Sequence, residues 1–179
     1  STNDTFLAFA AGEPLAEDQL EALEEGLTLV AQHLARSIAR DGEGATCLME
    51  VQVEGTDLEA EARQIARTIC GSSLVKTAVH GRDPNWGRIV AAAGRAGVAF
   101  DACAVALWIG PHQLVSEGRP LPFDRAAASA YLSERACGEY LVDDTVQIRL
   151  SLGDGVGQAI AWGCDLSDQY VRINADYTT

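Results

Sequence analysis

The longest periodic pattern in the chain predicts one amphipathic helix from about Leu15 to Arg40. Its apolar residues recur at spacings of three and four: Leu20, Leu23, Leu27, Val30, Leu34 and Ile38. Acidic residues fill its first turns and Arg36 and Arg40 lie near its end, an order that suits the helix dipole. Asp41-Gly42 ends the helix, and Gly42 is expected to adopt the left-handed conformation that is common at helix C-termini.

Shorter patterns then alternate between strand and helix. Residues 45–54 alternate apolar and polar side chains, which predicts a half-buried strand. Thr56 and Glu59 have the spacing of a capping box, which predicts a helix to about Cys70. Its expected inner face is Leu58, Ala62, Ile65, Ala66 and Ile69. Phe6 to Ala10 predicts a further strand. This alternation favours an α/β layered fold.

The second half of the chain predicts more strands and two short helices. Residues 100–110 favour a strand that pairs with residues 113–115, and Asp124 is expected to cap a helix to about Ala136. Residues 145–152 and 158–162 alternate as strands, and the Asp154-Gly155 turn between them predicts a hairpin. Ser167 is expected to cap a closing helical turn to Ile173. A soft boundary near Gly97 would separate residues 1–97, part of a layered catalytic domain, from a smaller α/β lobe at 98–179.

Composition narrows the class of partner. The 179 residues carry a net charge of −13, which disfavours nucleic acid and anionic membranes as partners. No apolar run approaches the ~20 residues of a membrane helix, and no N-terminal stretch has the pattern of a signal peptide. The five cysteines are widely spaced with no CxxC pair, so we expect buried free thiols, no metal site and a cytoplasmic location.

The densest polar segment is residues 74–89, where Gly81, Asp83-Pro84 and Asn85 predict a loop. Its chemically capable side chains are Lys76, His80, Arg82, Asp83, Asn85 and Arg88. Loops on packed scaffolds are where sites are commonly built. A structural interpretation stays open, in which Trp86 is a packing anchor and Arg88 pairs with Asp83.

Four stretches in order carry a resemblance over the whole chain. They are Ser1-Thr2-Asn3-Asp4-Thr5, Asp41-Gly42-Glu43-Gly44-Ala45-Thr46, Val75-Lys76-Thr77-Ala78 and Asn174-Ala175-Asp176-Tyr177-Thr178-Thr179. On these motifs the chain resembles the ornithine acetyltransferase family, specifically the C-terminal part of its β chain. The resemblance implies the family's self-cleaving fold, with helices packed on mixed sheets and a tail that returns to the active site.

The family's reaction moves an acetyl group from N-acetylornithine to glutamate in arginine biosynthesis. The resemblance implies a threonine nucleophile freed by autocatalytic cleavage, its α-amine as base, and a threonine-glycine oxyanion hole. The cleavage motif Ala-Thr-Met-Leu is absent from these residues, so no catalytic residue is assigned in this chain. Expected partners are the α chain and the N-terminal part of the β chain of the same precursor, in an α2β2 assembly. No cofactor is expected, although some members accept acetyl-CoA as acetyl donor.

The same resemblance implies three substrate-binding residues, Glu43, Asn174 and Thr179. By spacing alone, Glu43 would be a solvated turn residue between two glycines and the tail would be disordered. The resemblance instead predicts that these residues hold the amine and carboxylate ends of the amino-acid substrate.

Three alternatives stay open at this point. A related self-cleaving amidohydrolase or aminopeptidase would use water as acceptor. A non-catalytic scaffold or binding module would bind an amino acid without turnover. Ser1 as an N-terminal nucleophile is the third, but the resemblance disfavours it, because Ser1 matches a position within the family's second chain and after its nucleophile.

Overall fold

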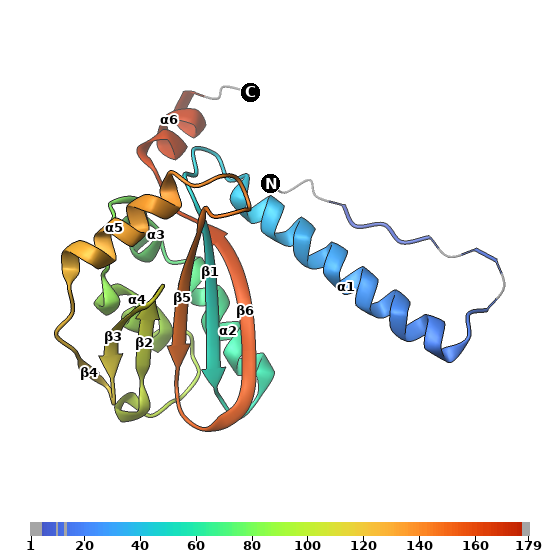
Figure 1. Cartoon of the computed structure of the whole chain (residues 1–179), viewed down its shortest axis with the longest axis horizontal. Helices are drawn as coiled ribbons and strands as arrows, with labels where there is room; N and C mark the ends of the chain where they lie inside the picture. The colour runs from blue at the N-terminus through green and yellow to red at the C-terminus, as the bar shows by residue number, and fades with distance from the viewer. Residues whose placement is uncertain (1–4, 10, 13, 177–179) are drawn as a thin grey trace. The chain divides into compact units, whose positions relative to one another are not determined.

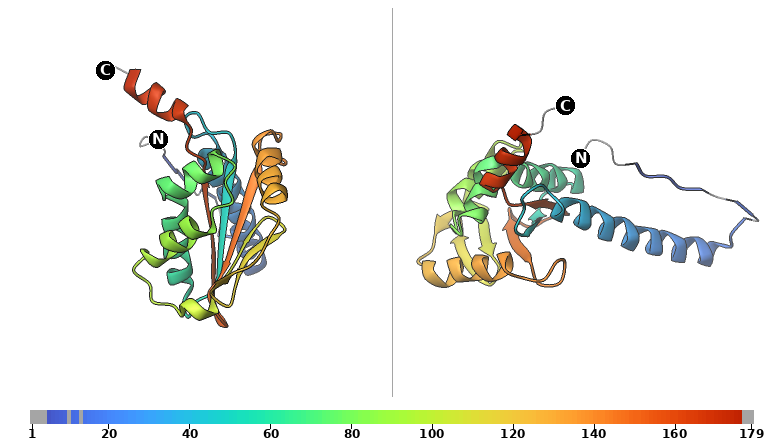
Figure 2. Two further views of the ribbon diagram at one scale, coloured as in Figure 1. Left: turned by 90° about the vertical axis from the view of Figure 1, so that its left-hand side faces the viewer. Right: turned by 90° about the horizontal axis from the view of Figure 1, so that it is seen from above.

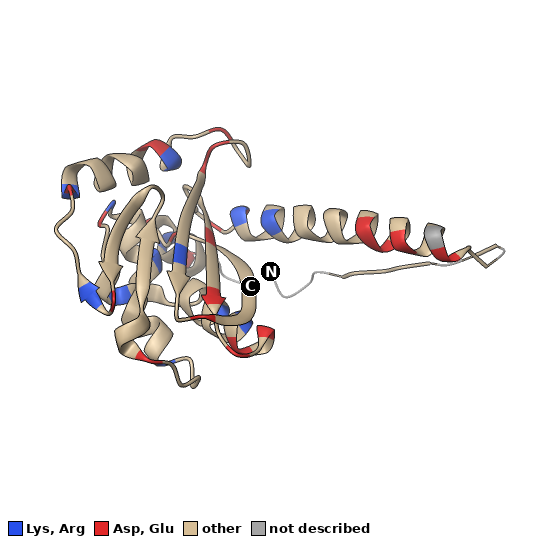
Figure 3. Cartoon of the chain, turned by 60° about the horizontal axis from the view of Figure 1, so that its bottom comes forward, with Lys and Arg blue, Asp and Glu red and all other residues tan. Residues whose placement is uncertain are grey.

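The computed structural model describes residues 5–9, 11, 12 and 14–176. The chain divides into two compact units, Ser1–Leu34 and Ala35–Thr179. Helix α1 (Glu17–Arg40) begins in the first unit and ends in the second, and it confirms the predicted long helix. Figure 3 shows acidic residues in its first turns and basic residues at its end, as expected from the dipole.

The first unit differs from expectation in two ways. The apolar stripe is present on α1, but its side chains are about half exposed; these are Leu20, Leu23, Leu27, Val30 and Leu34. The strand predicted at residues 6–10 is wrong: residues 5–9 are exposed and form no strand, and Ala10 lies outside the described residues. A strand needs hydrogen bonds to a neighbouring strand, and the sheet takes its strands from residues 48–164.

The second unit is built on a six-stranded mixed sheet (Figure 1). Its strands are β1 (Leu48–Gly55), β2 (Ala106–Ile109), β3 (His112–Ser116), β4 (Arg119–Pro120), β5 (Thr145–Ser151) and β6 (Gly155–Cys164). They lie in the order β4-β3-β2-β5-β1-β6. The β1–β5 pair is parallel and the other neighbouring pairs are antiparallel. β1 is therefore an inner strand between β5 and β6.

Helices cover the sheet unequally. The helices α2 (Glu59–Cys70), α3 (Ser73–His80) and α4 (Trp86–Gly94) lie on one face, and α5 (Arg125–Ala136) lies on the other (Figure 2). A 3₁₀ turn, Ala102–Ala104, precedes β2, and α6 (Asp168–Asp176) follows β6. Helices packed on a mixed sheet confirm the predicted α/β layered class.

The core lies between the sheet and α2 to α4. Alternate side chains of β1, Met49, Val51 and Val53, are fully buried there, in one cluster with Ile65 and Ile69 of α2. Burying each such side chain stabilises the fold by about 1.5–3 kcal/mol. The intervening β1 residues, on the other face, are only partly buried, which confirms the predicted alternation.

The predicted hairpin of β5 and β6 is wrong. Both strands pair with β1, which lies between them, so the connection crosses the end of β1 instead of turning tightly. A Cβ on Gly55 would come within 2.2 Å of the Gly153 carbonyl oxygen, and one on Gly155 within 2.1 Å of the Thr56 carbonyl oxygen. The glycine run therefore serves close backbone contact across β1, which mimics a hairpin signal in the sequence.

The predicted capping box of α2 is also wrong. Leu58 is the N-cap, its N–H donates to the Glu61 carboxylate at 3.1 Å, and the Leu58 side chain is 62% exposed. The Thr56 hydroxyl instead donates to the Leu58 carbonyl at 2.9 Å. Only the Glu61 half of a capping box is therefore present, two residues beyond the predicted Thr56–Glu59 spacing, and Leu58 does not belong to the inner face.

Two further predictions are confirmed and one is confirmed in part. Asp124 caps α5 by accepting from the Ala127 N–H at 3.0 Å, and β3 pairs with β2, both as expected. The predicted strand 100–110 is shorter, because residues 102–104 form the 3₁₀ turn. The sheet draws β1 from before residue 97 and its other strands from after it; the division into residues 1–97 and 98–179 stays a prediction.

Candidate substrate-binding site

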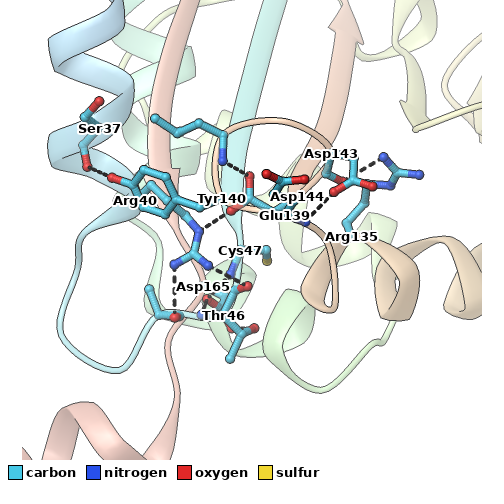
Figure 4. A network of polar contacts seen from close by, with 12 residues as sticks. Ser37, Arg40, Thr46, Cys47, Arg135, Glu139, Tyr140, Asp143, Asp144 and Asp165 are labelled. Carbon is cyan, nitrogen blue, oxygen red and sulfur yellow. Dashed lines mark hydrogen bonds and ion pairs between the residues drawn. The ribbon is translucent and has the colours of Figure 1, made fainter.

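Residues 41–46 connect α1 to β1, and two buried aspartates hold this loop. The first is Asp144, which precedes β5 and has a fully buried side chain. It accepts the Leu141 N–H at 3.0 Å and forms an ion pair with Arg40 Nε. The two Nη atoms of Arg40 donate to the carbonyls of Ala45 and Thr46, each at 3.2 Å. Arg40 thus ties the end of α1 to the start of β1 (Figure 4).

The second aspartate is Asp165, which follows β6 and is 2% exposed. One carboxylate oxygen accepts the N–H groups of Thr46 and Cys47, at 2.7 and 3.2 Å. The other accepts the Thr46 hydroxyl at 2.7 Å and lies 2.8 Å from His80 Nδ1. Burial alone would raise the pKa of Asp165, but the hydrogen bonds from Thr46, His80 and Cys47 outweigh it and lower that pKa. The carboxylate is therefore charged at neutral pH.

Glycines on both sides of Glu43 bring the loop against the segment that leads into α6. Gly44 has φ +70°, and a Cβ there would lie 2.7 Å from Ser167 Oγ; that hydroxyl donates to the Gly44 carbonyl at 2.7 Å. A Cβ on Gly42 would lie 2.5 Å from Cys164 Sγ. The left-handed residue is thus Gly44, and its prediction at Gly42 is wrong. The thiol of Cys164 leaves no room for a side chain at position 42, so this residue has to be glycine.

This arrangement brings Glu43 and Asn174 together from positions 131 residues apart in sequence. Asn174, in α6, donates from Nδ2 to the Glu43 carboxylate and to the Tyr170 carbonyl, the latter at 2.9 Å. Both side chains belong to exposed residues. The third residue of the predicted set, Thr179, lies outside the described residues. An exposed carboxylate beside an amide is suited to binding a group that carries several N–H donors.

The candidate segment 74–89 has a shorter loop than expected. Residues 74–80 belong to α3 and only residues 81–85 connect it to α4. Asp83 forms an ion pair with Arg125 at 2.6 Å, and Asn85 caps α4 by accepting the Arg88 N–H at 3.2 Å. Arg88 itself donates to the Leu74 carbonyl at 2.9 Å, so its predicted pairing with Asp83 is wrong. Trp86 is partly buried against the core, which confirms it as a packing anchor.

Arg82 contacts the first loop directly, and the main chain of Lys76 contacts the segment that follows β6. Arg82 has φ 57° and donates from its two Nη atoms to the Val79 carbonyl at 2.9 Å and to Thr46 Oγ1 at 3.2 Å. The Lys76 carbonyl accepts the Leu166 N–H at 3.2 Å. The segment that looked most like a site in the sequence therefore braces the Glu43 loop through its main chain, His80 and Arg82.

The cysteines partly match expectation. All five are free thiols; Cys47 and Cys70 are buried, whereas Cys103 and Cys137 are exposed, against the prediction that they are buried. Burial raises the pKa of Cys47 and Cys70 to about 12, which makes both inert as nucleophiles. Within the described residues, no three His, Cys, Asp or Glu side chains form a group that could hold a metal ion. In the same residues, no helix is long and apolar enough to cross a membrane.

Fold and site together define a class: an α/β layered protein that presents a loop-held carboxylate beside an amide from a distant helix. The model of the ArgJ family matches residues 1–179, and the chain belongs to that family. This confirms the family predicted from the four sequence motifs.

Known relatives agree with that assignment. The chain is 74% identical over 179 residues to the arginine biosynthesis bifunctional protein ArgJ of Prochlorococcus marinus strain MIT 9313, which covers all of this chain and 42% of that protein. It is 69% identical to the protein of the same name in Parasynechococcus marenigrum strain WH8102, again over all of this chain and 42% of the other. It thus spans about two-fifths of the length of these relatives.

A solved structure supports the fold. The crystal structure of the arginine biosynthesis bifunctional protein from Bacillus halodurans matches with a TM-score of 0.84 and 41% sequence identity. The match covers 93% of this chain and 75% of that chain.

Proposed function

We propose that this chain is part of an acyltransferase that moves an acetyl group from N-acetylornithine to glutamate in arginine biosynthesis. The intermediate is an acetyl-threonine whose nucleophile lies outside these 179 residues, and this chain supplies part of the substrate-binding surface. Membership of the ArgJ family supports the proposal, as does the arginine-biosynthesis name of a relative that is 74% identical.

The observation that carries the proposal is the hydrogen bond from Asn174 to the Glu43 carboxylate. Two residues assigned to substrate binding from separate motifs meet at one point of the surface. No described cation forms an ion pair with Glu43, because Arg40 pairs with Asp144 and Arg82 donates to Thr46 and Val79. The Glu43 charge therefore stays available for the ammonium group of the substrate.

The assignment of roles follows from the chemistry of the groups. Glu43 accepts hydrogen bonds from the substrate ammonium, and Asn174 orients that carboxylate while offering its amide to the substrate. Thr179 is proposed as the third member of the set. The buried frame around Asp144 and Asp165 keeps the loop in place, so that binding loses little conformational entropy.

The proposal includes the remaining segments of the protein. The partners are the α chain and the N-terminal part of the β chain of the same precursor, assembled as α2β2 in the cytoplasm. The five free thiols fit a reducing compartment. No cofactor is required, and acetyl-CoA is a second acetyl donor to be tested.

The test is acetyl transfer by the full-length protein from N-acetylornithine, with glutamate or water as acceptor. Glu43→Gln should lower kcat/KM for N-acetylornithine by about 10-fold or more, because a charge-assisted hydrogen bond is lost. The matched control is Glu134→Gln, which removes an exposed carboxylate from α5 and should leave the kinetics unchanged. Equal kinetics in Glu43→Gln and the unchanged protein would sink the site assignment.

The same assay separates the alternatives. A self-cleaving amidohydrolase or aminopeptidase would release acetate at the same rate with or without glutamate. A non-catalytic binding protein would retain substrate binding without any turnover. The proposal requires acetylglutamate to form in proportion to the ornithine released.

A further inference from the structure

A pocket of about 310 Å³ lies on the side of the sheet that α5 occupies. Its walls include Tyr131 and Arg135 of α5, Glu50 of β1 and Thr145 of β5, together with Arg36. Arg36 belongs to the end of α1, within the second unit. None of these residues was predicted to form a site.

Three polar atoms in the walls are buried and lack a hydrogen-bond partner among the described residues: Arg36 Nε, Arg135 Nε and Thr145 Oγ1. Buried polar groups in folded proteins nearly always have a partner, because an unsatisfied one keeps its full desolvation cost. Three such atoms around one cavity point to a ligand that completes their hydrogen bonds.

The rest of the Arg135 side chain is already held in place. Its Nη1 donates to the Asp143 carbonyl at 2.7 Å, a contact drawn in Figure 4, and its guanidinium lies 5.5 Å from the centre of the Tyr131 ring. The Tyr131 hydroxyl in turn accepts the Gln147 N–H at 3.1 Å. Arg135 is therefore fixed by two other groups, the Asp143 carbonyl and the Tyr131 ring, while its Nε–H has no partner among the described residues.

The chemistry of the free donors selects the ligand. A guanidinium offers N–H groups in a planar fork that matches the two oxygens of a carboxylate, and a hydroxyl can donate to the same group. Glu50 and Asp143 also line the pocket, and their charges oppose a multiply charged anion such as phosphate. The ring of Tyr131 provides an apolar wall beside the donors.

We propose that Arg36, Arg135 and Thr145 form a binding site for a carboxylate group. The carboxylate belongs either to a small free molecule or to an acidic side chain in the part of the protein outside these 179 residues. Both sources use the same contacts, and the proposal does not depend on the acetyltransferase assignment.

The first test is calorimetric titration of the full-length protein with benzoate, which combines a carboxylate with a ring, and with benzylamine of opposite charge. Benzoate should bind saturably and benzylamine should not. Arg36→Gln should weaken benzoate binding by about 10-fold or more, as expected for one charge-assisted hydrogen bond. Arg63→Gln, which changes an exposed arginine of α2, should leave the affinity unchanged.

A second variant keeps the test valid if Arg36→Gln does not fold. Thr145→Val removes one hydroxyl from the pocket and should weaken benzoate binding by about 3-fold or more. Benzoate that binds both variants as tightly as the unchanged protein would overturn the proposal, as would equal binding of benzylamine.

If benzoate does not bind, a crystal structure of the full-length protein separates the two sources. A side-chain carboxylate from elsewhere in the protein, hydrogen-bonded to Arg36 and Arg135, would support the site with an internal ligand. A pocket that holds only water, or is covered by apolar side chains, would overturn it.

Discussion

The loops at residues 41–46 and 81–85 both carry charged side chains at helix ends, but they are held in opposite ways. The ion pair of the second loop, Asp83 with Arg125, has side chains that are 33% and 65% exposed. The first loop is fixed by Asp144 and Asp165, whose side chains are fully buried. Exposed pairs contribute little to stability, whereas a buried charge that loses its partner is costly.

The difference shows that the buried polar contacts are concentrated at the first loop. Glu43 itself is exposed, and the rigid contacts of its loop are made by its neighbours Ala45 and Thr46. Arg82, in the second loop, donates to Thr46 in the first, which makes one loop a support of the other. The charged segment 74–89 therefore has a positioning role toward the first loop, and the proposed binding residues Glu43 and Asn174 lie outside it.

The largest expected effect is that of Arg40→Met. It leaves Asp144 charged, buried and without its cation, which should lower the free energy of unfolding by about 3–5 kcal/mol. Arg40→Lys keeps the charge but loses donors to the Ala45 and Thr46 carbonyls. Its free energy of unfolding should lie between those of Arg40→Met and the unchanged protein. Urea denaturation of the full-length protein measures both. Arg63→Met, at an exposed ion pair, is the control, and an equal loss there would remove the distinction between the two loops.

Asp165→Asn comes next. The amide keeps one oxygen but loses the negative charge to which Thr46, Cys47 and His80 are hydrogen-bonded. The free energy of unfolding should therefore fall by about 2–3 kcal/mol. Asp168→Asn, in an exposed pair with Arg172, should change it by less than about 1 kcal/mol. Equal effects of the two variants in urea denaturation would mean that the buried carboxylate does not hold the loop.

Acidification should remove the contribution of Asp165. Its folded pKa is lowered from the ordinary value of 3.8, so its stabilising effect is fully present above pH 3.8 and is lost as the pH falls through the folded pKa. The difference in unfolding free energy between the unchanged protein and Asp165→Asn should shrink over that range. Denaturation at a series of pH values from 7 downward tests this; a difference that grew on acidification would contradict the sign.

The smallest effect belongs to the exposed pair of the second loop. Arg125→Gln removes the partner of Asp83, and the free energy of unfolding should change by less than about 1 kcal/mol, because both side chains are solvated and screened. Raising the salt concentration should reduce even this difference. A loss as large as that of Arg40→Met would show that exposure does not separate the two loops.

Much of the fold follows from local pattern. The period of α1, the alternation along β1 and the Asp124 cap of α5 depend on neighbouring residues, and each was predictable. The placement of β1 between β5 and β6 depends on pairing across the chain, which no local pattern contains. The Gly153–Gly157 run looked like a hairpin because close backbone contact and tight turns both require glycine.

The site divides in the same way. The proposed site residues Glu43 and Asn174 are indicated only by family motifs, because spacing alone makes one a turn residue and the other part of a polar tail. Arg40, Asp144 and Asp165 were missed, since their partners lie up to 119 positions away. One local signal existed for Asp165: an acidic residue directly after the apolar end of a strand needs a buried partner.

The measurement that tests the account most directly is a double-mutant cycle on Glu43→Gln and Asn174→Ala in the full-length protein. The quantity is kcat/KM for N-acetylornithine with glutamate as acceptor. If the two residues form one substrate contact, the double variant should lose less than the sum of the single losses, with a coupling of about 1 kcal/mol or more. Strictly additive losses, or no loss in either single variant, would contradict the shared site.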